Sequence, residues 1–201
     1  MASLIHMVRH GEVENPDHVV YGRLPGFGLS TRGMQQAADA GRHMATSPVV
    51  AVWSSPLQRA IETAEKIASR HALPVRIEES LTEWRLSDVW QGCSWDSLPT
   101  SHPGQLERYL KTPWDLPFSP ESLEEVADRV AEVVRLAHEI HSKGEVVIVS
   151  HQDPMQAALL LLTGGTLATQ HVDKSMHATV YTIKPGTPWA LNARYDPETH
   201  R

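Results

Sequence analysis

The sequence predicts an α/β fold, a three-layer sandwich in which a mostly parallel central sheet carries helices on both faces, with a small cap or lid inserted. Short apolar runs typical of buried strands alternate along the chain with segments of helical periodicity, as in proteins with parallel sheets. Between about residues 85 and 120 the alternation stops, and short apolar fragments broken by prolines predict the insertion. The 201 residues suit one domain spanning 1–201.

The first apolar run, residues 4–8, is followed at once by Arg9, His10 and Gly11. A short apolar run with a turn signal behind it is typical of a strand covered on both faces. Open α/β sheets bind ligands at the carboxyl ends of their strands. Gly11 allows a sharp turn and a close approach to a ligand, and the guanidinium of Arg9 matches a phosphate or a carboxylate.

Residues 12–28 form a loop rich in glycine, proline and small polar residues. A loop of this length without structure of its own is typically functional or disordered. Tyr21 and Arg23 are therefore expected to reach over the end of the first strand.

Ser30 is predicted to cap a helix that ends near residue 45, and residues 49–53 form the second strand. Ser55 and Pro56 then predict the start of a helix, with Ser55 as its cap and Pro56 at its first position. Arg59 falls in the first turn, where free amides and the helix dipole also favour an anion. Taken alone, this position favours a surface arginine of an amphipathic helix, and an anion site is the alternative.

A third strand over residues 74–77 is followed by Glu83, which places a carboxylate just beyond its end. The predicted cap follows, and four of the six tryptophans lie in or beside it: Trp84, Trp90, Trp95 and Trp114. We expect them to form the packing core of the cap, with the alternative that one of them lines a substrate pocket.

Ser122 and Glu125 have the spacing of a capping box, and apolar residues at helical spacing follow as far as Gly144. Residues 145–149 are a buried strand that leads into Ser150 and His151. A second histidine thus follows a strand end.

Asp153 and Pro154 predict the next helix, as its cap and its first residue. Residues 178–183 and 190–195 suit two closing strands. Since the carboxyl ends of parallel strands meet at one edge of a sheet, the two histidines, the arginine-bearing helix start and the glutamate are expected to converge there.

Composition excludes several classes of protein. The formal net charge of −6 leaves no basic stripe for nucleic acid. The longest apolar run, residues 157–162, is too short to span a membrane. The single cysteine, Cys93, and the absence of a secretory signal at the start predict a cytoplasmic protein.

Twelve histidines raise the question of a metal site. No H-E-x-x-H motif occurs, and one cysteine excludes cysteine-rich zinc sites. His138 and His141 lie three residues apart on a predicted helix and could clamp a metal, but a solvated helix face is favoured. We expect neither a metal nor a cofactor.

The chain resembles the histidine phosphatase superfamily, which includes the cofactor-dependent phosphoglycerate mutases. The resemblance covers most of the chain in the family's order. Its motifs are Arg9-His10-Gly11; Leu29-Ser30 with Gly33 and Gln36-Ala37; Ser54-Ser55-Pro56-Leu57 with Arg59-Ala60 and Thr63-Ala64; Leu81 with Glu83; Trp90-Gln91-Gly92; Glu121-Ser122-Leu123 with Arg129-Val130; and Val149-Ser150-His151.

This resemblance implies a catalytic set. His10 would attack phosphorus and carry a phosphohistidine intermediate. Arg9, Arg59 and His151 would hold the phosphoryl oxygens, whose charge must be balanced in the transition state. Glu83 would protonate the leaving alkoxide and then deprotonate the attacking water.

The substrate contacts expected from the sequence are Gly11, Asn15, Tyr21, Arg23 and Gln152. Gln152 stands where the family commonly has a glycine. Asn15 lies one residue nearer to the Arg-His-Gly motif than the family's usual asparagine.

The function predicted from these residues is metal-independent hydrolysis of a small phosphorylated metabolite. A phosphoglycerate mutase is the alternative, although mutases of the family carry a longer segment where this chain has residues 85–120, and a non-catalytic phosphoester-binding domain is a third. A second branch takes its acid from an aspartate directly after the second histidine; Asp153 lies one position too late, which favours Glu83. The chain is compatible with a homodimer.

Overall fold

The computed structural model describes residues 1–199, and its centre is a six-stranded sheet with the order β3-β2-β4-β1-β5-β6. Four neighbouring strands are parallel, whereas β5 runs antiparallel to β1 and β6 antiparallel to β5. The predicted mostly parallel sheet is therefore confirmed. The strands are β1 (Leu4–Arg9), β2 (Val49–Ser54), β3 (Val75–Ile77), β4 (Glu145–Ser150), β5 (Val180–Lys184) and β6 (Ala190–Tyr195).

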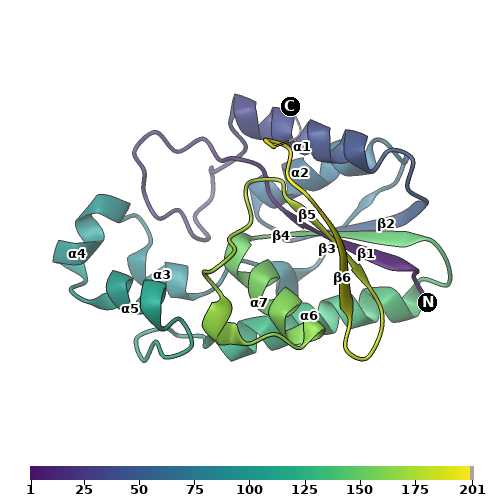
Figure 1. Ribbon diagram of the computed structural model, residues 1–201. Coiled ribbons are helices and arrows are strands. Elements are labelled where there is room, and N and C mark those ends of the chain that lie inside the picture. Colours follow the sequence, from purple (N-terminus) through teal and green to yellow (C-terminus); the bar gives the residue numbers. More distant parts are fainter. Residues whose placement is uncertain (200–201) are drawn as a thin grey trace.

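Two pairs of helices cover the two faces of this sheet (Figure 1). On one face lie α1 (Thr31–His43) and α2 (Gln58–Ala68), and on the other lie α6 (Leu123–Ile140) and α7 (Gln152–Thr163). The three-layer sandwich expected from the sequence is thus confirmed.

Strand β4 shows why the central strands are continuous apolar runs. Successive side chains of a strand point to opposite faces of the sheet. Val146 and Ile148 belong to the hydrophobic cluster beneath α6 and α7, and Val147 and Val149 belong to the cluster beneath α1 and α2. Because both faces are covered, the four central positions of the strand, residues 146–149, are all apolar.

The expected cap consists of short helices that lie together beside the sheet, at the left of Figure 1. They are α3 (Leu86–Trp90), η2 (Trp95–Ser97), α4 (Leu98–Ser101) and α5 (Gln105–Lys111), and the remaining short helices are η1 (Glu79–Leu81) and η3 (Leu167–Thr169). The loop after β1 joins the cap through hydrogen bonds of Val20 with Cys93 and Gly92.

The tryptophan prediction is half right. Trp84 and Trp90 are each 1% exposed and belong to a third hydrophobic cluster, which holds the cap together. Trp95 and Trp114 are 39% and 45% exposed, so they are not core residues. The alternative role also holds, because Trp84, Trp90 and Trp95 line a cavity.

The predicted start of α2 is wrong by two residues. The helix begins at Gln58, with Leu57 as its N-cap and no side-chain cap. Ser55 and Pro56 precede it, because the hydroxyl of Ser55 forms a 2.8 Å hydrogen bond with Nε2 of His151 on the neighbouring strand end. The hydroxyl of Ser55 still accepts a 3.3 Å hydrogen bond from the amide of Leu57, so it has a local and a tertiary partner at once.

The predicted cap of α7 is also wrong. The N-cap residue is His151, so Asp153 and Pro154 lie inside the first turn. Asp153 accepts a hydrogen bond from the hydroxyl of Tyr109 instead of capping the helix.

The other helix signals agree with the structure. Ser30 caps α1, and Ser122 and Glu125 form the predicted capping box at the start of α6. That helix ends at Ile140, and Gly144 adopts a positive φ of 82° in the turn that follows.

His138 and His141 do not form a pair. His138 hydrogen-bonds the carbonyl of Ala2, and the ring of His141 lies against Trp53 with 6.0 Å between centroids. Among residues 1–199 no group of three His, Cys, Asp or Glu side chains could hold a metal ion. None of the helices in the described range is both long and apolar enough to cross a membrane.

Candidate active site

Sheet register brings the predicted catalytic residues together. Arg9 at the end of β1 pairs with Ser150 at the end of β4, and β2 ends beside them at Ser54. His10 and His151 therefore follow adjacent strand ends, with 5.1 Å between their ring centroids. The two histidines thus lie side by side at one edge of the sheet, as the sequence predicts.

His10 is buried and is oriented by its own backbone. Its Nδ1 donates a 2.7 Å hydrogen bond to the carbonyl of Gly11, which can only accept, so we assign the proton to Nδ1. The lone pair of Nε2 accepts a 3.2 Å hydrogen bond from Nε of Arg59. Burial, followed by the nearby Arg59 and His151, holds the pKa of His10 well below its ordinary value. The ring is therefore neutral at neutral pH, and Nε2 carries the unprotonated lone pair that a nucleophile needs once a phosphoryl group takes the place of this hydrogen bond.

His151 has the opposite arrangement of its ring nitrogens. The hydroxyl of Ser55 accepts from the amide of Leu57 and has one proton, which it can donate to Nε2 of His151. We assign the imidazole proton to Nδ1, because this atom is buried without a hydrogen-bond partner and lies 3.7 Å from an acceptor, Oε2 of Glu83. Burial and Arg59 hold the pKa of His151 well below its usual range. His151 is thus a neutral donor on the side of Glu83.

Arg9 is fixed on one side by the chain segment before β5. Its guanidinium donates a 2.6 Å hydrogen bond to the carbonyl of Ser175 and a 3.1 Å one to Nε2 of His177. The Nε atom is buried and has no partner. This atom is a donor available to an anion in the site.

Arg59 is 1% exposed and is held by the loop after β1. It donates a 2.8 Å hydrogen bond to the carbonyl of Gly22, and its guanidinium lies 4.7 Å from the centre of the Tyr21 ring. The buried position at the start of α2 favours the anion-site reading over that of a surface arginine.

Glu83 lies near the two arginines of the site, Arg59 and Arg9. Its Oε2 lies 3.9 Å from Arg59, and its Oε1 accepts a 2.8 Å hydrogen bond from the amide of Trp84. Burial raises the pKa of Glu83 to about 7, although Arg59 acts in the opposite direction. A carboxyl group with this pKa can both give and take a proton near neutral pH.

Asp153, the alternative acid, has both carboxylate oxygens in hydrogen bonds. Oδ2 accepts from the hydroxyl of Tyr109 at 2.8 Å, and Oδ1 from the side chain of Gln170 at 3.3 Å. Asp153 thus joins helix α7 to the cap helix α5 and to Gln170, which favours Glu83 as the acid.

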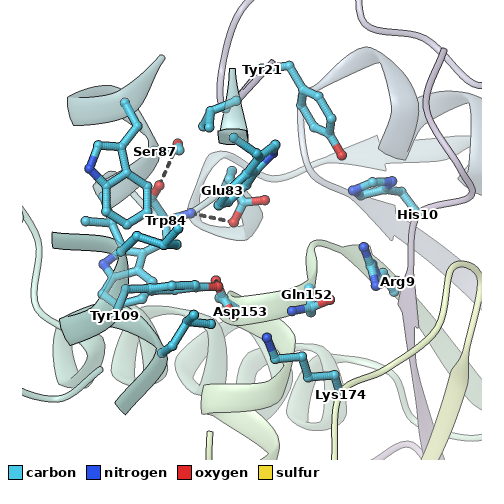
Figure 2. Close-up of a pocket in the computed structure, with 17 residues that line it drawn as sticks. Arg9, His10, Tyr21, Glu83, Trp84, Ser87, Tyr109, Gln152, Asp153 and Lys174 are labelled. Carbon is cyan, nitrogen blue, oxygen red and sulfur yellow. Dashed lines mark hydrogen bonds between the residues drawn. The ribbon is translucent and has the colours of Figure 1, made fainter. Parts of the chain in front are cut away.

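A cavity of about 320 Å³ opens beside these groups. Figure 2 shows Arg9 and His10 on one side of it and Trp84 and Tyr109 on the opposite side, with Glu83 between them. Of the predicted substrate contacts, Tyr21 and Gln152 line the cavity. Its other lining residues are Val20, Gly22, Leu86, Ser87, Trp90, Trp95, Leu106, Leu110, Asp153 and Lys174.

Gly11 does not line this cavity. Its amide donates to the hydroxyl of Thr63, and a Cβ added to it would lie 2.5 Å from the carbonyl oxygen of Gly33. The close approach expected of this glycine is therefore to helix α1.

Asn15 and Arg23 also lie outside the lining. The side chain of Asn15 forms two hydrogen bonds with the backbone of Val19, which closes a turn of the loop. The side chain of Arg23 is 43% exposed and lies 3.8 Å from Asp88. Direct substrate contacts by these two residues stay a prediction.

Sequence reasoning missed three residues that the structure places at the site. Ser55 was assigned to a helix cap, whereas it orients His151. His177 and Lys174 lie in the irregular segment before β5, where no periodicity or motif marks them. Only the tertiary fold brings these residues to the strand ends.

Comparison with known proteins gives a family match over nearly the whole chain. Residues 5–192 match the family described as histidine phosphatase superfamily, branch 1. The chain is 41% identical over 179 residues to the uncharacterized protein Rv0525 of Mycobacterium tuberculosis, covering 81% of this chain and 80% of that one. It is 32% identical over 173 residues to phosphoserine phosphatase 1 of Hydrogenobacter thermophilus, covering 84% and 79%.

A similar solved structure is the mycobacterial glucosyl-3-phosphoglycerate phosphatase in complex with VO3. It superposes with a TM-score of 0.85 at 26% identity, covering 95% of this chain and 98% of that one. The likeness therefore includes both the sheet with its helices and the cap.

Proposed function

This chain belongs to the histidine phosphatase superfamily and is a phosphatase, and we propose that it hydrolyses phosphomonoesters by way of a phosphohistidine on His10. The observation that carries the proposal is the neutral, buried His10 with Nε2 unprotonated and directed at Arg59. A phosphoryl group placed there meets a nucleophile and a cation together.

In the first step, Nε2 of His10 attacks phosphorus while the bond from phosphorus to the ester oxygen breaks. The phosphoryl oxygens carry the charge in this transition state, and we assign the donors to them as Arg9, which lines the cavity, with Arg59 and Nδ1–H of His151 behind it. Glu83, protonated, gives its proton to the departing oxygen and becomes a carboxylate. The positive charge that develops on the His10 ring is stabilised by the hydrogen bond from Nδ1 to the carbonyl of Gly11.

In the second step, the Glu83 carboxylate takes a proton from water as the water oxygen attacks phosphorus. The phosphorus–nitrogen bond breaks and returns its electron pair to Nε2 of His10. Inorganic phosphate leaves, and both residues regain their starting protonation states.

The substrate belongs to the class of small phosphorylated metabolites. The named relatives are phosphatases of phosphoserine and of glucosyl-3-phosphoglycerate, and a cavity of about 320 Å³ suits a compound of that size. We further propose that residues 1–201 are one domain with a cap over about 85–120. A cytoplasmic location and a homodimer are likewise proposals, the former resting on the single Cys93.

Hydrolysis of p-nitrophenyl phosphate by the wild type and by His10→Ala tests this function. We expect turnover by the wild type in the presence of EDTA, because arginine and histidine side chains balance the charge, and loss of at least about 10³-fold in the variant, which lacks the nucleophile. His102→Ala, a histidine of the cap outside the cavity lining, is the matched control and should retain full activity. Turnover by His10→Ala close to that of the wild type would overturn the proposal.

A further inference from the structure

The cavity has a distinctly apolar side, opposite the catalytic histidine. Its residues come from the cap and its approach, and we call them the apolar wall: Trp84, Leu86, Trp90, Trp95, Leu106 and Leu110. They line the cavity into which the alcohol part of a phosphomonoester must extend once its phosphoryl group lies beside His10. Figure 2 shows one of them, Trp84, across the cavity from His10.

The two buried indoles of the wall offer no hydrogen-bond donor to a ligand. Nε1 of Trp84 donates to the carbonyl of Glu121 at 2.8 Å, and Nε1 of Trp90 donates to the side chain of Gln105 at 2.8 Å. An indole has only this one polar atom. Both rings therefore present carbon to the cavity.

The polar side chains beside the wall already have hydrogen-bond partners within the protein. The hydroxyl of Tyr109 donates to Asp153, and the hydroxyl of Ser87 donates to the backbone carbonyl of Trp84. Gln152 and Lys174 line the cavity and form no side-chain hydrogen bond within residues 1–199, but Figure 2 shows them toward Arg9, away from Trp84. A hydroxyl-rich alcohol would lose its bonds to water here and find few replacements.

The outer part of the wall leaves large apolar side chains exposed to water. Trp95 is 39% exposed and Leu110 is 48% exposed, and both lie on the cavity lining. Clustered apolar side chains in a concave site are typical of surfaces that bind an apolar ligand. Covering them would remove apolar surface from water, which is favourable in proportion to the area covered.

We propose that the preferred substrates are phosphomonoesters of apolar alcohols, with the phosphoryl group beside His10 and the hydrocarbon part against the apolar wall. This inference rests on the proposed phosphatase function and names its substrate class. It separates this chain from a phosphatase that selects a polar alcohol such as an amino acid or a sugar.

The test is a series of straight-chain alkyl phosphates from ethyl to hexyl, assayed for kcat/KM at one pH. The leaving alcohols have nearly equal basicity, so differences report contacts of the chain. We expect kcat/KM to rise about two- to fourfold for each methylene that the wall covers. Propyl phosphate should exceed glycerol 3-phosphate, which has the same carbon chain with two hydroxyls, by at least about tenfold.

Variants of the wall test whether its residues cause the dependence of kcat/KM on chain length. Leu110→Asn and Trp95→Gln replace exposed parts of the wall by polar groups and should reduce the dependence on chain length by lowering kcat/KM for hexyl phosphate. Trp114→Ala is the matched control, because Trp114 is 45% exposed in the same segment but does not line the cavity. Its chain-length dependence should equal that of the wild type, and thermal unfolding of each variant verifies that it is folded.

Three results would overturn the inference in distinguishable ways. Hydrolysis of p-nitrophenyl phosphate without any rise along the alkyl series, or with glycerol 3-phosphate preferred to propyl phosphate, would overturn the substrate class and leave the phosphatase function standing. A rise that Leu110→Asn and Trp95→Gln do not reduce would show that the wall is not responsible. Failure of the wild type to hydrolyse any phosphomonoester would overturn both proposals together.

Discussion

His10 and His151 are both neutral and buried, yet they present opposite atoms to the site. A histidine ring is fixed in one tautomer by the hydrogen bond that its second nitrogen makes. The carbonyl of Gly11 accepts a hydrogen bond from Nδ1–H of His10, which leaves the lone pair on Nε2, beside Arg59. The hydroxyl of Ser55 is assigned as donor to Nε2 of His151, which leaves an N–H on Nδ1, beside Glu83. Two identical side chains thereby become a nucleophile and a donor.

The substitution Glu83→Gln should lower kcat/KM by different factors for substrates with different leaving groups. Gln cannot protonate a departing alkoxide, so kcat/KM for alkyl phosphates should fall by about 10²–10⁴-fold. p-Nitrophenolate leaves without a proton, so kcat/KM for its ester should fall far less. Equal losses for both esters would assign the acid to another residue, with Asp153 the next to be tested.

The pKa of Glu83 sets the direction of the pH dependence. Its carboxyl group is protonated below about pH 7 and ionised above it. The acid for the first step is therefore lost as the pH rises, and kcat/KM for alkyl phosphates should decline above about pH 7. The decline should be absent with p-nitrophenyl phosphate and absent in Glu83→Gln. A decline of the same size in Glu83→Gln would contradict this assignment.

The loop that follows β1 meets helix α1 through two glycines, Gly11 and Gly33. A Cβ on Gly11 would lie 2.5 Å from the carbonyl of Gly33, and a Cβ on Gly33 would lie 2.0 Å from that of Glu12. Real side chains do not approach backbone this closely, so the turn after His10 is positioned directly by helix α1. The geometry of the nucleophile depends on this contact between two backbones.

Gly33→Ala should therefore lower both stability and activity. We expect the free energy of unfolding to fall by about 1–3 kcal/mol, because overpacking outweighs the better helix propensity of alanine. Urea unfolding measures the first effect and hydrolysis of p-nitrophenyl phosphate the second. Gln35→Ala, an exposed position on the same helix, is the control and should change neither. A Gly33→Ala protein as stable and active as the wild type would contradict this account of the contact.

In the molecule as a whole, the site lies where the sheet meets the cap. The sheet edge supplies His10, Arg9 and His151, whereas the cap supplies the apolar wall. The protein has a net charge of −6, but two buried arginines, Arg9 and Arg59, supply positive charge beside His10. In the proposed function, the phosphoryl group lies at the sheet edge and the alcohol part against the apolar wall of the same cavity.

The sequence predicts most of what depends on local pattern. The strand ends that carry His10 and His151 follow from apolar runs, and the capping box of Ser122 follows from spacing. The sheet order β3-β2-β4-β1-β5-β6 does not follow from any local pattern, although the parallel arrangement does. Strand ends and helix caps are thus predicted because residues close together in the chain specify them, whereas sheet order depends on distant pairings.

The predictions that failed concern side chains with tertiary partners. Ser55 and Asp153 have the sequence signature of caps, but each is hydrogen-bonded to a residue far away in the chain. Gly11 packs against Gly33, a contact that the sequence does not predict, and its ligand contact stays a prediction. Lys174 reaches the cavity from a segment without any pattern. A sequence pattern indicates which hydrogen bonds a side chain can form, but the tertiary structure determines which partner lies within reach.

The measurement that tests the central claim most directly is detection of the phosphohistidine itself. Glu83→Gln should accumulate it from p-nitrophenyl phosphate, because formation needs no acid whereas breakdown needs the base. After rapid quenching in alkali, mass spectrometry of the intact protein and of its peptides should find one phosphoryl group, on His10. A stoichiometric burst of p-nitrophenol with His10 unmodified, or a phosphoryl group on another residue, would contradict the account.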